Sequence, residues 1–215
     1  MENKINIKKF ELLPSMGVNT YLIWNSNNEG LIIDPAFSGN DLISFIKEKN
    51  IKITKILNTH GHFDHIGGND FFSDYFDVDI AIHKEDAKMI TDPKLNLSVF
   101  SGKEIKSKPA KIILEDNQII KLGNKKIRVI HTPGHSGGSV SFLIDDFLFS
   151  GDTLFYLSIG RTDLPGGNYK TLANSIEKKL FKLADEIQVF PGHGKFTFIG
   201  DEKVENPFFG ILGGH

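Results

Sequence analysis

Short apolar runs, separated by polar turns, alternate with amphipathic segments in the first half of the chain. Runs of this length, rich in Ile, Leu and Phe, are typical of strands, whereas apolar residues at positions i, i+3 and i+4 are typical of helices. These patterns predict strands over residues 5–13, 19–24, 31–34, 53–57 and 78–82, and helices over residues 40–49, 69–75 and 84–90. Asn40 or Asp41 is the expected cap of the first helix.

The second half of the chain is richer in strands. Apolar runs predict strands over residues 111–114, 118–122, 126–131, 139–144, 147–150 and 186–190. A helix is expected from Asn168 or Thr171 to about Lys182, and a shorter one over residues 201–206. Residues 93–108 show little periodicity and are expected to form a long surface loop. No repeat or linker divides the chain, so we expect one domain over residues 1–215.

Composition narrows the classes of function. The formal net charge is -2, which gives no electrostatic reason to expect nucleic acid or an anionic membrane as partner. No run approaches the roughly 18 apolar residues that a membrane span needs, and the first ten residues lack the apolar core of a secretory signal. A cytoplasmic protein is therefore expected. There is no cysteine, so any metal site must use His, Asp or Glu.

Candidate metal ligands are concentrated directly after the predicted strand 53–57. His60, His62 and His65 offer imidazoles and Asp64 offers a carboxylate, all ligand types for a borderline divalent cation. Neither a helical nor a strand period gathers all four around one ion, so we expect a loop that shares them between two ions. Independent placement of 8 His in 215 residues gives this three-His spacing in about one chain in a hundred, which disfavours a chance cluster of surface histidines.

Three further candidates stand in turn sequences after predicted strands. They are His135, Asp152 and His193, and each follows a glycine, which lets the backbone turn sharply. Ligands in open α/β sheets collect at such strand ends. Asp34, just before Pro35, ends another strand; it is expected either to accept a hydrogen bond from a ligating imidazole or to be a plain turn residue.

With these residues the chain resembles the metallo-β-lactamase superfamily, whose His-x-His-x-Asp-His motif and separate His, Asp and His it matches at every position. The resemblance implies an α/β fold, a four-layer αβ/βα sandwich with the site along one edge of two packed sheets. It also implies two divalent metal ions, zinc first, with iron or manganese as alternatives. One ion would take His60, His62 and His135, the other Asp64, His65 and His193, and Asp152 would bridge them.

Within the superfamily, three phrases look most like the glyoxalase II group, the hydroxyacylglutathione hydrolases. They are Gly-Asp-Thr-Leu-Phe at 151–155, Gly-Arg-Thr-Asp at 160–163 and Pro-Gly-His-Gly at 191–194. The length and the Asn-Pro-Phe-Phe phrase at 206–209 are similar to short bacterial members that lack the C-terminal helical domain.

This narrower resemblance implies hydrolysis of a thioester such as S-D-lactoylglutathione by a hydroxide bridging the two ions, with Asp64 and Asp152 as catalytic residues. The Lys and Tyr that hold glutathione in full-length members are not both present, because Arg161 falls near the Lys and no Tyr follows it. The thiol carrier therefore stays open. Arg161 is a candidate for binding a substrate carboxylate, and a salt bridge with Asp163 or Asp34 is the alternative.

Other activities are compatible with the same motifs. A persulfide dioxygenase would use one iron and usually carries Pro-Ala-His-Asp where this chain has Pro-Gly-His-Gly, which favours the hydrolase. A lactonase, a β-lactamase or another ester hydrolase would use the same scaffold, and a metal-bound interaction module would bind ions without turnover. His83 and His131 match no family ligand position. His131 is expected either to support a ligand or to lie in the core, and His83→Ala is expected to be nearly silent.

Overall fold

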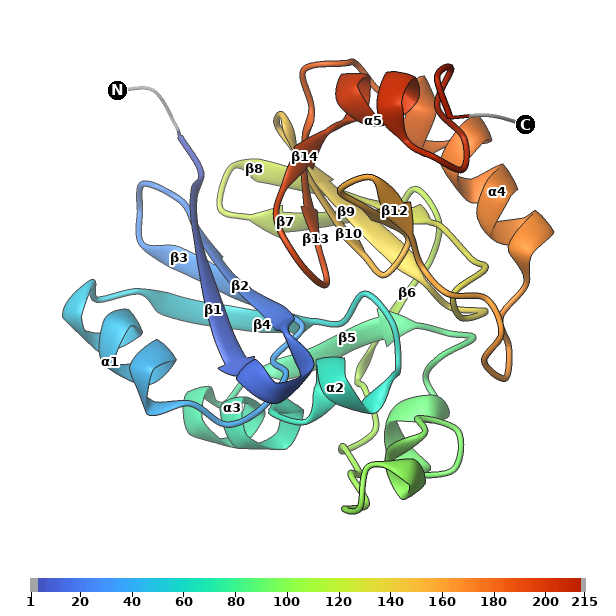
Figure 1. Cartoon of the computed structure of the whole chain (residues 1–215). Helices are drawn as coiled ribbons and strands as arrows, with labels where there is room; N and C mark the ends of the chain where they lie inside the picture. The colour runs from blue at the N-terminus through green and yellow to red at the C-terminus, as the bar shows by residue number, and fades with distance from the viewer. Residues whose placement is uncertain (1–3, 214–215) are drawn as a thin grey trace.

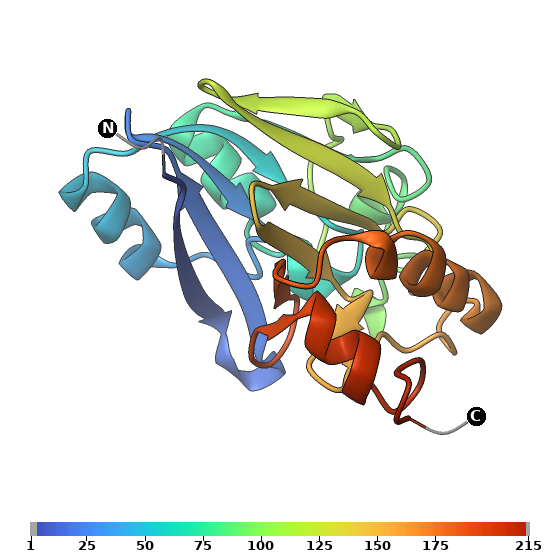
Figure 2. The same ribbon diagram turned by 90° about the horizontal axis from the view of Figure 1, so that it is seen from above.

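Two six-stranded sheets pack face to face in the computed structural model, which describes residues 4–213. Helices cover the outer face of each sheet, so the molecule has four layers (Figure 1). The view from above shows the two sheets meeting at the centre with the helices on opposite sides (Figure 2). The predicted αβ/βα sandwich is confirmed.

The first sheet contains the N-terminal strands in sequence order, β1 to β6. Its first three strands pair antiparallel, and β3 to β6 pair parallel. Helices connect β3 to β4 and β4 to β5, whereas the connection from β5 to β6 contains only short 3₁₀ helices. The outer face carries helices α1 and α3 (Figure 1). Bounds are β1 Asn6–Leu13, β2 Val18–Trp24, β3 Glu29–Ile33, α1 Asn40–Glu48, β4 Lys52–Leu57, α2 Phe63–Ile66, α3 Asn69–Phe76, β5 Asp79–His83 and β6 Ile112–Leu114.

The second sheet is built from the C-terminal half in the order β14-β13-β10-β9-β8-β7. Strands β10 and β13 are parallel and the other pairs antiparallel. Helices α4 and α5 cover its outer face (Figure 1). Bounds are β7 Ile119–Leu122, β8 Lys125–His131, β9 Val140–Ile144, β10 Phe147–Gly151, α4 Tyr169–Lys178, β13 Gln188–Pro191, β14 Thr197–Phe198 and α5 Ile199–Glu205. The short strands β11 (Leu154–Phe155) and β12 (Ser158–Ile159) form a separate two-stranded sheet.

Apolar side chains fill all three spaces between the layers. Between the sheets lie Ile33, Leu57, Val129, Phe142 and Phe149, each at most 1% exposed. Separate clusters lie under the helices of each sheet. Because the central strands are covered on both faces, they are almost continuously apolar, as the short runs in the sequence indicate. This packing fixes the two sheets relative to each other and so positions the loops at their shared edge.

Two predictions about the first half are wrong. Residues 84–90 do not form a helix; they form turns followed by a short 3₁₀ helix, η2 (Met89–Thr91). The amides of Asp86 and Met89 bond three residues back, at 3.0 and 2.9 Å, because the Asp86 side chain is buried among loop donors and holds the segment in turns. Gly39 is the N-cap of α1, and neither Asn40 nor Asp41 caps it through a side chain.

The second half differs from the prediction mainly in its shortest elements. Asn168 caps α4, and its side chain accepts a hydrogen bond from the Thr171 amide at 2.9 Å, as expected. The helix ends at Lys178 and continues as a 3₁₀ turn, η4 (Leu180–Lys182). The two-residue strands β11, β12 and β14 were not predicted. Residues 93–108 are irregular except for the 3₁₀ helix η3 (Ser98–Phe100).

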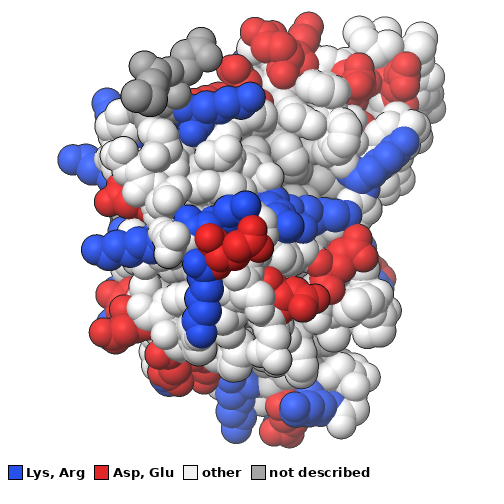
Figure 3. Space-filling view, turned by 90° about the vertical axis from the view of Figure 1, so that its left-hand side faces the viewer, with Lys and Arg blue, Asp and Glu red and all other residues white. Residues whose placement is uncertain are grey.

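Charged side chains of both signs alternate over the surface. Figure 3, which views the side where α1 and β1 lie, shows Lys and Arg interleaved with Asp and Glu. Pairs such as Lys9 with Glu11 and Lys49 with Glu48 contribute to this mixture. None of the helices within residues 4–213 has the length and apolar character needed to cross a membrane.

Candidate metal centre

The early histidine cluster lies at the C-terminal end of β4. His60 and His62 lie in the extended loop after the strand, and Asp64 and His65 lie in α2, a helix of one turn. The sequence predicted a loop that carries all four ligands; the structure divides them between a loop and a helical turn instead. His62 is the N-cap of this helix, so the chain changes direction between the first pair and the second.

The other three candidates come from the second sheet. His135 follows β8, Asp152 follows β10 and His193 follows β13, each at the C-terminal end of its strand. The glycines before them are needed for different reasons. Gly151 has a φ of +51°, which favours glycine, and a Cβ at Gly192 would lie 2.2 Å from Oδ1 of Asp152. The structure thus brings the seven predicted ligands to one edge of the sandwich.

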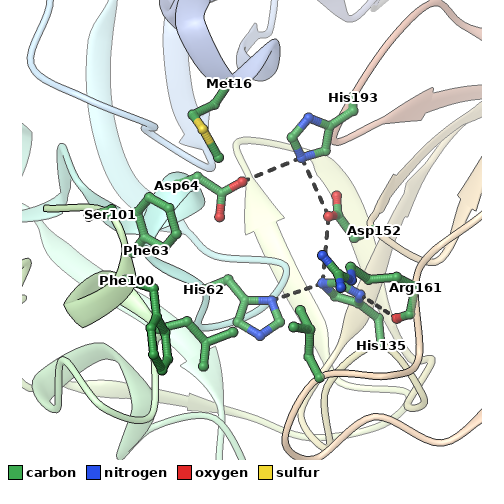
Figure 4. Close-up of a pocket in the computed structure, with 12 residues that line it drawn as sticks. Met16, His62, Phe63, Asp64, Phe100, Ser101, His135, Asp152, Arg161 and His193 are labelled. Carbon is green, nitrogen blue, oxygen red and sulfur yellow. Dashed lines mark hydrogen bonds and ion pairs between the residues drawn. The ribbon is translucent and has the colours of Figure 1, made fainter.

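The side chains form two groups around a shared carboxylate. His60, His62 and His135 have candidate ligand atoms within 4.8 Å of one another, and so have Asp64, His65 and His193. Asp152 lies between the groups, because its Oδ2 is 3.5 Å from Nε2 of both His135 and His193 (Figure 4). This is the division of ligands that the family resemblance implies.

The spacing of the atoms fits bound cations. Distances of 3.4 to 3.7 Å separate the imidazole and carboxylate atoms of the second group from one another and from Asp152. These are long for hydrogen bonds, but two ligands about 2.1 Å from a tetrahedral ion lie about 3.4 Å apart. In the first group, Nδ1 of His62 and Nε2 of His135 are 2.9 Å apart, which is a hydrogen-bond distance, so the longer spacing is found in the second group and around Asp152.

Unsatisfied buried atoms support the same conclusion. Among the described residues, four buried side-chain atoms have no hydrogen-bond partner, and all belong to candidate ligands: His60 Nε2, His62 Nε2, His65 Nε2 and Asp152 Oδ1. A buried polar atom left unpaired costs about 1–3 kcal/mol. A cation coordinated at the centre would compensate for this cost, so the residues fit divalent metal ions.

Two imidazoles of the first group, those of His60 and His62, are electrically neutral. Burial lowers the pKa of His60 well below 6.5, and electrostatic interaction with His65 and His135 lowers it further. Burial, followed by electrostatic interaction with His135, lowers the pKa of His62 to about 3. Neutral imidazoles keep the lone pair that coordination needs. At neutral pH this group is therefore ready to bind a cation without losing protons from these two rings.

The second group holds charge of both signs. Burial opposes ionisation of Asp152, but the charge on His65 and the contact with His193 outweigh it and hold the Asp152 pKa well below 3.8. Burial likewise opposes protonation of His193, but its contacts with Asp152 and Asp64 raise its pKa to about 9. In the protein without metal, imidazolium protons supply the positive charge that the carboxylates require, and a cation would displace them.

Asp34 orients the imidazole ring of His65. Its buried carboxylate accepts hydrogen bonds from the Thr59 amide at 2.7 Å and the Thr59 hydroxyl at 2.6 Å, and it contacts Nδ1 of His65 at 3.0 Å. These contacts direct Nε2 of His65 toward the carboxylates of Asp64 and Asp152. The predicted contact between Asp34 and a candidate ligand is present.

Other supports were not predicted from the sequence. The carbonyl oxygen of Arg161 is 2.9 Å from Nδ1 of His135, and a backbone carbonyl has no residue signature. The Asn19 side chain donates to the carbonyls of Pro191 and Gly194, both at 2.9 Å, and so ties the His193 loop to the first sheet. The signal available for Asn19 is a buried amide within the apolar strand β2.

An open cavity of about 560 Å³ lies over the centre. Five candidate ligands, Arg161 and Ser101 form the polar part of its lining, and the apolar part is formed by Met16, Phe63, Leu97, Phe100 and Leu164. Figure 4 shows Met16, Phe63 and Phe100 on the side of the cavity away from His135 and Asp152. Arg161 lines the cavity but donates two hydrogen bonds of 2.8 Å to exposed Asp163. The salt bridge expected as the alternative role of Arg161 is therefore present with Asp163, and its role toward substrate stays a prediction.

His83 and His131 lie outside both ligand groups. Their rings stack at a centroid distance of 4.0 Å and an interplanar angle of 15°, and they come from the ends of β5 and β8 in different sheets. Nε2 of His131 contacts the carbonyl of Gly137 at 2.9 Å. The expectation that neither residue is a metal ligand stays a prediction.

Comparison with known proteins identifies the family. The profile of the metallo-beta-lactamase superfamily matches residues 14–193, which include all seven candidate ligands. The chain belongs to this superfamily. Among curated members, it is 40% identical over 186 residues to the probable metallo-hydrolase YqgX of Bacillus subtilis, covering 85% of this chain and 88% of that protein. It is 36% identical over 211 residues to the hydroxyacylglutathione hydrolase GloC of Haemophilus influenzae, covering 92% and 96%.

Solved structures of the superfamily have the same fold. The BLEG-1 B3 metallo-beta-lactamase superimposes with a TM-score of 0.90 at 40% identity, covering 94% of this chain and 99% of that one. ETHE1 from Myxococcus xanthus gives 0.79 at 26% identity, covering 94% and 83%. TTHA1623 in a di-iron-bound form gives 0.79 at 33% identity, covering 89% and 95%.

Proposed function

We propose that this chain is a metal-dependent thioester hydrolase with two metal ions, and that S-D-lactoylglutathione is a substrate. The observation that carries the proposal is the pair of three-ligand groups that share Asp152 on the floor of an open cavity. The similarity to the hydroxyacylglutathione hydrolase GloC, over nearly the full length of both chains, supports the choice of substrate.

The candidate ligands and the bound ions would divide the chemistry. His60, His62 and His135 would hold one ion and Asp64, His65 and His193 the other, with Asp152 between them. Such ions lower the pKa of water to about 7 and polarise a carbonyl. The ionised carboxylates of Asp64 and Asp152 lie at the same place, and Asp152 Oδ1, which has no hydrogen-bond partner among the described residues, can accept a proton from the attacking water.

The cavity lining favours a leaving group that departs without a proton. No Lys or Tyr is among the described residues that line it, and the guanidinium of Arg161 is paired with Asp163 and does not release a proton near neutral pH. A thiol has a pKa of about 8.5, so a thiolate can depart unprotonated, whereas an amine must be protonated as it leaves. This contrast favours thioesters over β-lactams.

A specific observation nevertheless supports β-lactam hydrolysis as a second candidate. The BLEG-1 structure, titled a B3 metallo-beta-lactamase, superimposes on 94% of this chain at 40% identity. A lactamase would need a proton donor for the departing amine. Among the described residues that line this cavity, the imidazoles of the centre are the available sources.

One experiment compares these activities in a single preparation. The protein is loaded separately with zinc, iron and manganese, its metal content is counted, and it is assayed with S-D-lactoylglutathione, a panel of other thioesters, a chromogenic cephalosporin, and glutathione persulfide with an oxygen electrode. The proposal expects two ions per chain and thioester hydrolysis faster than cephalosporin hydrolysis. Turnover of the cephalosporin alone would establish the second candidate. One iron per chain with oxygen consumption on the persulfide would establish a dioxygenase instead.

A further inference from the structure

Asp86 is a buried carboxylate whose hydrogen bonds all lead to the loops that carry the first ligand group. Its side chain is 1% exposed and lies in the turn after β5. Oδ2 accepts from the Gly61 amide at 2.9 Å and from the Ser136 hydroxyl at 2.6 Å, and Oδ1 accepts from the Gly138 amide at 2.7 Å. Hydrogen bonds to an ionised acceptor are stronger than neutral ones.

These donors belong to two loops from different sheets. Gly61 lies between His60 and His62, on the loop after β4 of the first sheet. Ser136 follows His135 directly, on the loop after β8 of the second sheet. One carboxylate therefore connects the neighbours of all three candidate ligands of the first group. The described hydrogen bonds of Asp86 include none to Asp64, His65 or His193.

The fit around this carboxylate is tight. A Cβ at Gly138 would lie 2.6 Å from Oδ1 of Asp86, and a Cβ at Gly61 would lie 2.6 Å from Cβ of Met89 in the same segment. Contacts this short do not occur between real side chains, so both loops require glycine where they approach the Asp86 segment. The position of the Asp86 segment thus limits how far the two loops can shift.

We propose that Asp86 is a positioning residue that sets the separation between the His60–His62 loop and the His135 loop, and with it the affinity of the first metal position. It is not a catalytic residue, because it lines neither the cavity nor either ligand group. The inference rests on the proposed function only in that these two loops hold a metal ion. Partners that orient ligands typically contribute 10–100-fold to metal affinity, and we expect an effect of that size at one position.

Zinc titration of the metal-free protein against a chromophoric chelator tests the proposal. The wild-type protein should give two dissociation constants, which His62→Ala and His193→Ala assign to the first and second positions. Asp86→Asn keeps the shape of the side chain but replaces one acceptor oxygen with a donor, and Asp86→Ala removes both acceptors. Both variants should weaken the step that His62→Ala affects by 10–100-fold and leave the other step within about threefold.

Glu202→Gln is the matched control. Glu202 is also a fully buried carboxylate, and it accepts from the Leu157 amide, the Thr197 hydroxyl and the Asn206 side chain, none of which adjoins the first ligand group. Thermal unfolding of the metal-free proteins measures the purely structural cost of each change. The control should lower the unfolding midpoint while leaving both zinc constants unchanged.

Two results would overturn the proposal. One is an unchanged pair of zinc constants in Asp86→Asn. The other is equal weakening of both steps by the Asp86 variants and by Glu202→Gln, in proportion to lost stability, which would make Asp86 an ordinary structural residue. If Asp86→Ala does not fold, Asp86→Asn alone decides. No thioester enters the titration, so a failure of the proposed hydrolase activity would leave this result standing.

Discussion

Mild acid should destabilise the protein through His83. This side chain is 2% exposed and its ring lies against His131; Lys84, Glu85 and Asp116 are the other charged groups that influence it. Burial, followed by the positive charge on His131, lowers the pKa of His83 from 6.5 to about 4. The unfolded chain therefore takes up a proton at a higher pH than the folded chain does.

The magnitude follows from this difference. Each pH unit between the unfolded and folded pKa corresponds to about 1.4 kcal/mol, so the separation amounts to about 3 kcal/mol. Folding lowers the pKa of this base, so its contribution to the free energy of unfolding is fully present above pH 6.5. The contribution is lost as the pH falls toward 4. This loss is a large share of the stability of a typical domain.

Urea unfolding of metal-free wild type and His83→Phe, from pH 7.5 to 4, measures the effect. Phenylalanine keeps a flat ring against His131 but cannot take up a proton, and the imidazoles of the metal centre titrate in both proteins and cancel in the difference. As the pH falls from 6.5 to 4, the free energy of unfolding of His83→Phe should rise relative to that of the wild type by about 3 kcal/mol. In His131→Phe the loss should be smaller, because one cause of the depressed pKa is removed. Parallel curves for wild type and His83→Phe would refute the reasoning.

Three further predictions concern the centre and the core. Asp152→Ala removes the carboxylate shared by both groups. Metal analysis should therefore find about one ion fewer per chain, and thioester turnover should fall at least about 100-fold. Full turnover with two ions bound would contradict a shared role. Asp34→Asn should weaken metal binding 10–100-fold in a chelator competition, because His65 loses its carboxylate partner; unchanged affinity would argue against this contact. Phe142→Ala, between the sheets and fully buried, should cost about 3–5 kcal/mol in urea unfolding of the metal-free protein, and a cost below about 1 kcal/mol would indicate that the sheets repack.

The fold was predictable where the sequence pattern is long or chemically specific. The apolar runs that become β2, β3, β9 and β10 are covered on both faces, so burial leaves a clear signal in each. The layered arrangement of the sheets required the family resemblance, because periodicity describes single elements. The two-residue strands β11, β12 and β14 leave no periodic signal at all.

The prediction of local structure was wrong where side-chain contacts decide the backbone conformation. Residues 84–90 have apolar positions typical of a helix, but the Asp86 carboxylate binds amides from two distant loops and holds the segment in turns. A capping residue was expected at Asn40 or Asp41, but Gly39 takes that position.

The candidate ligands were predictable, while most of their supports were not. Histidine and aspartate after glycine are specific residue types at specific places, and all seven converge at one edge of the molecule. The carbonyl of Arg161 and the side chains of Asn19 and Asp86 act across 25 to 175 residues of sequence. No local pattern encodes contacts over such separations.

The candidate centre draws its ligands from opposite halves of the chain. His60 to His65 arise from the N-terminal sheet, and His135, Asp152 and His193 from the C-terminal sheet. Bound cations would therefore link the two sheets at their shared edge. Neither half of the chain could form the complete coordination sphere by itself during synthesis. After the ions are removed, local unfolding should begin at the edge where the sheets meet, before either sheet unfolds. Protease cleavage after chelation should therefore begin in the loops at that edge.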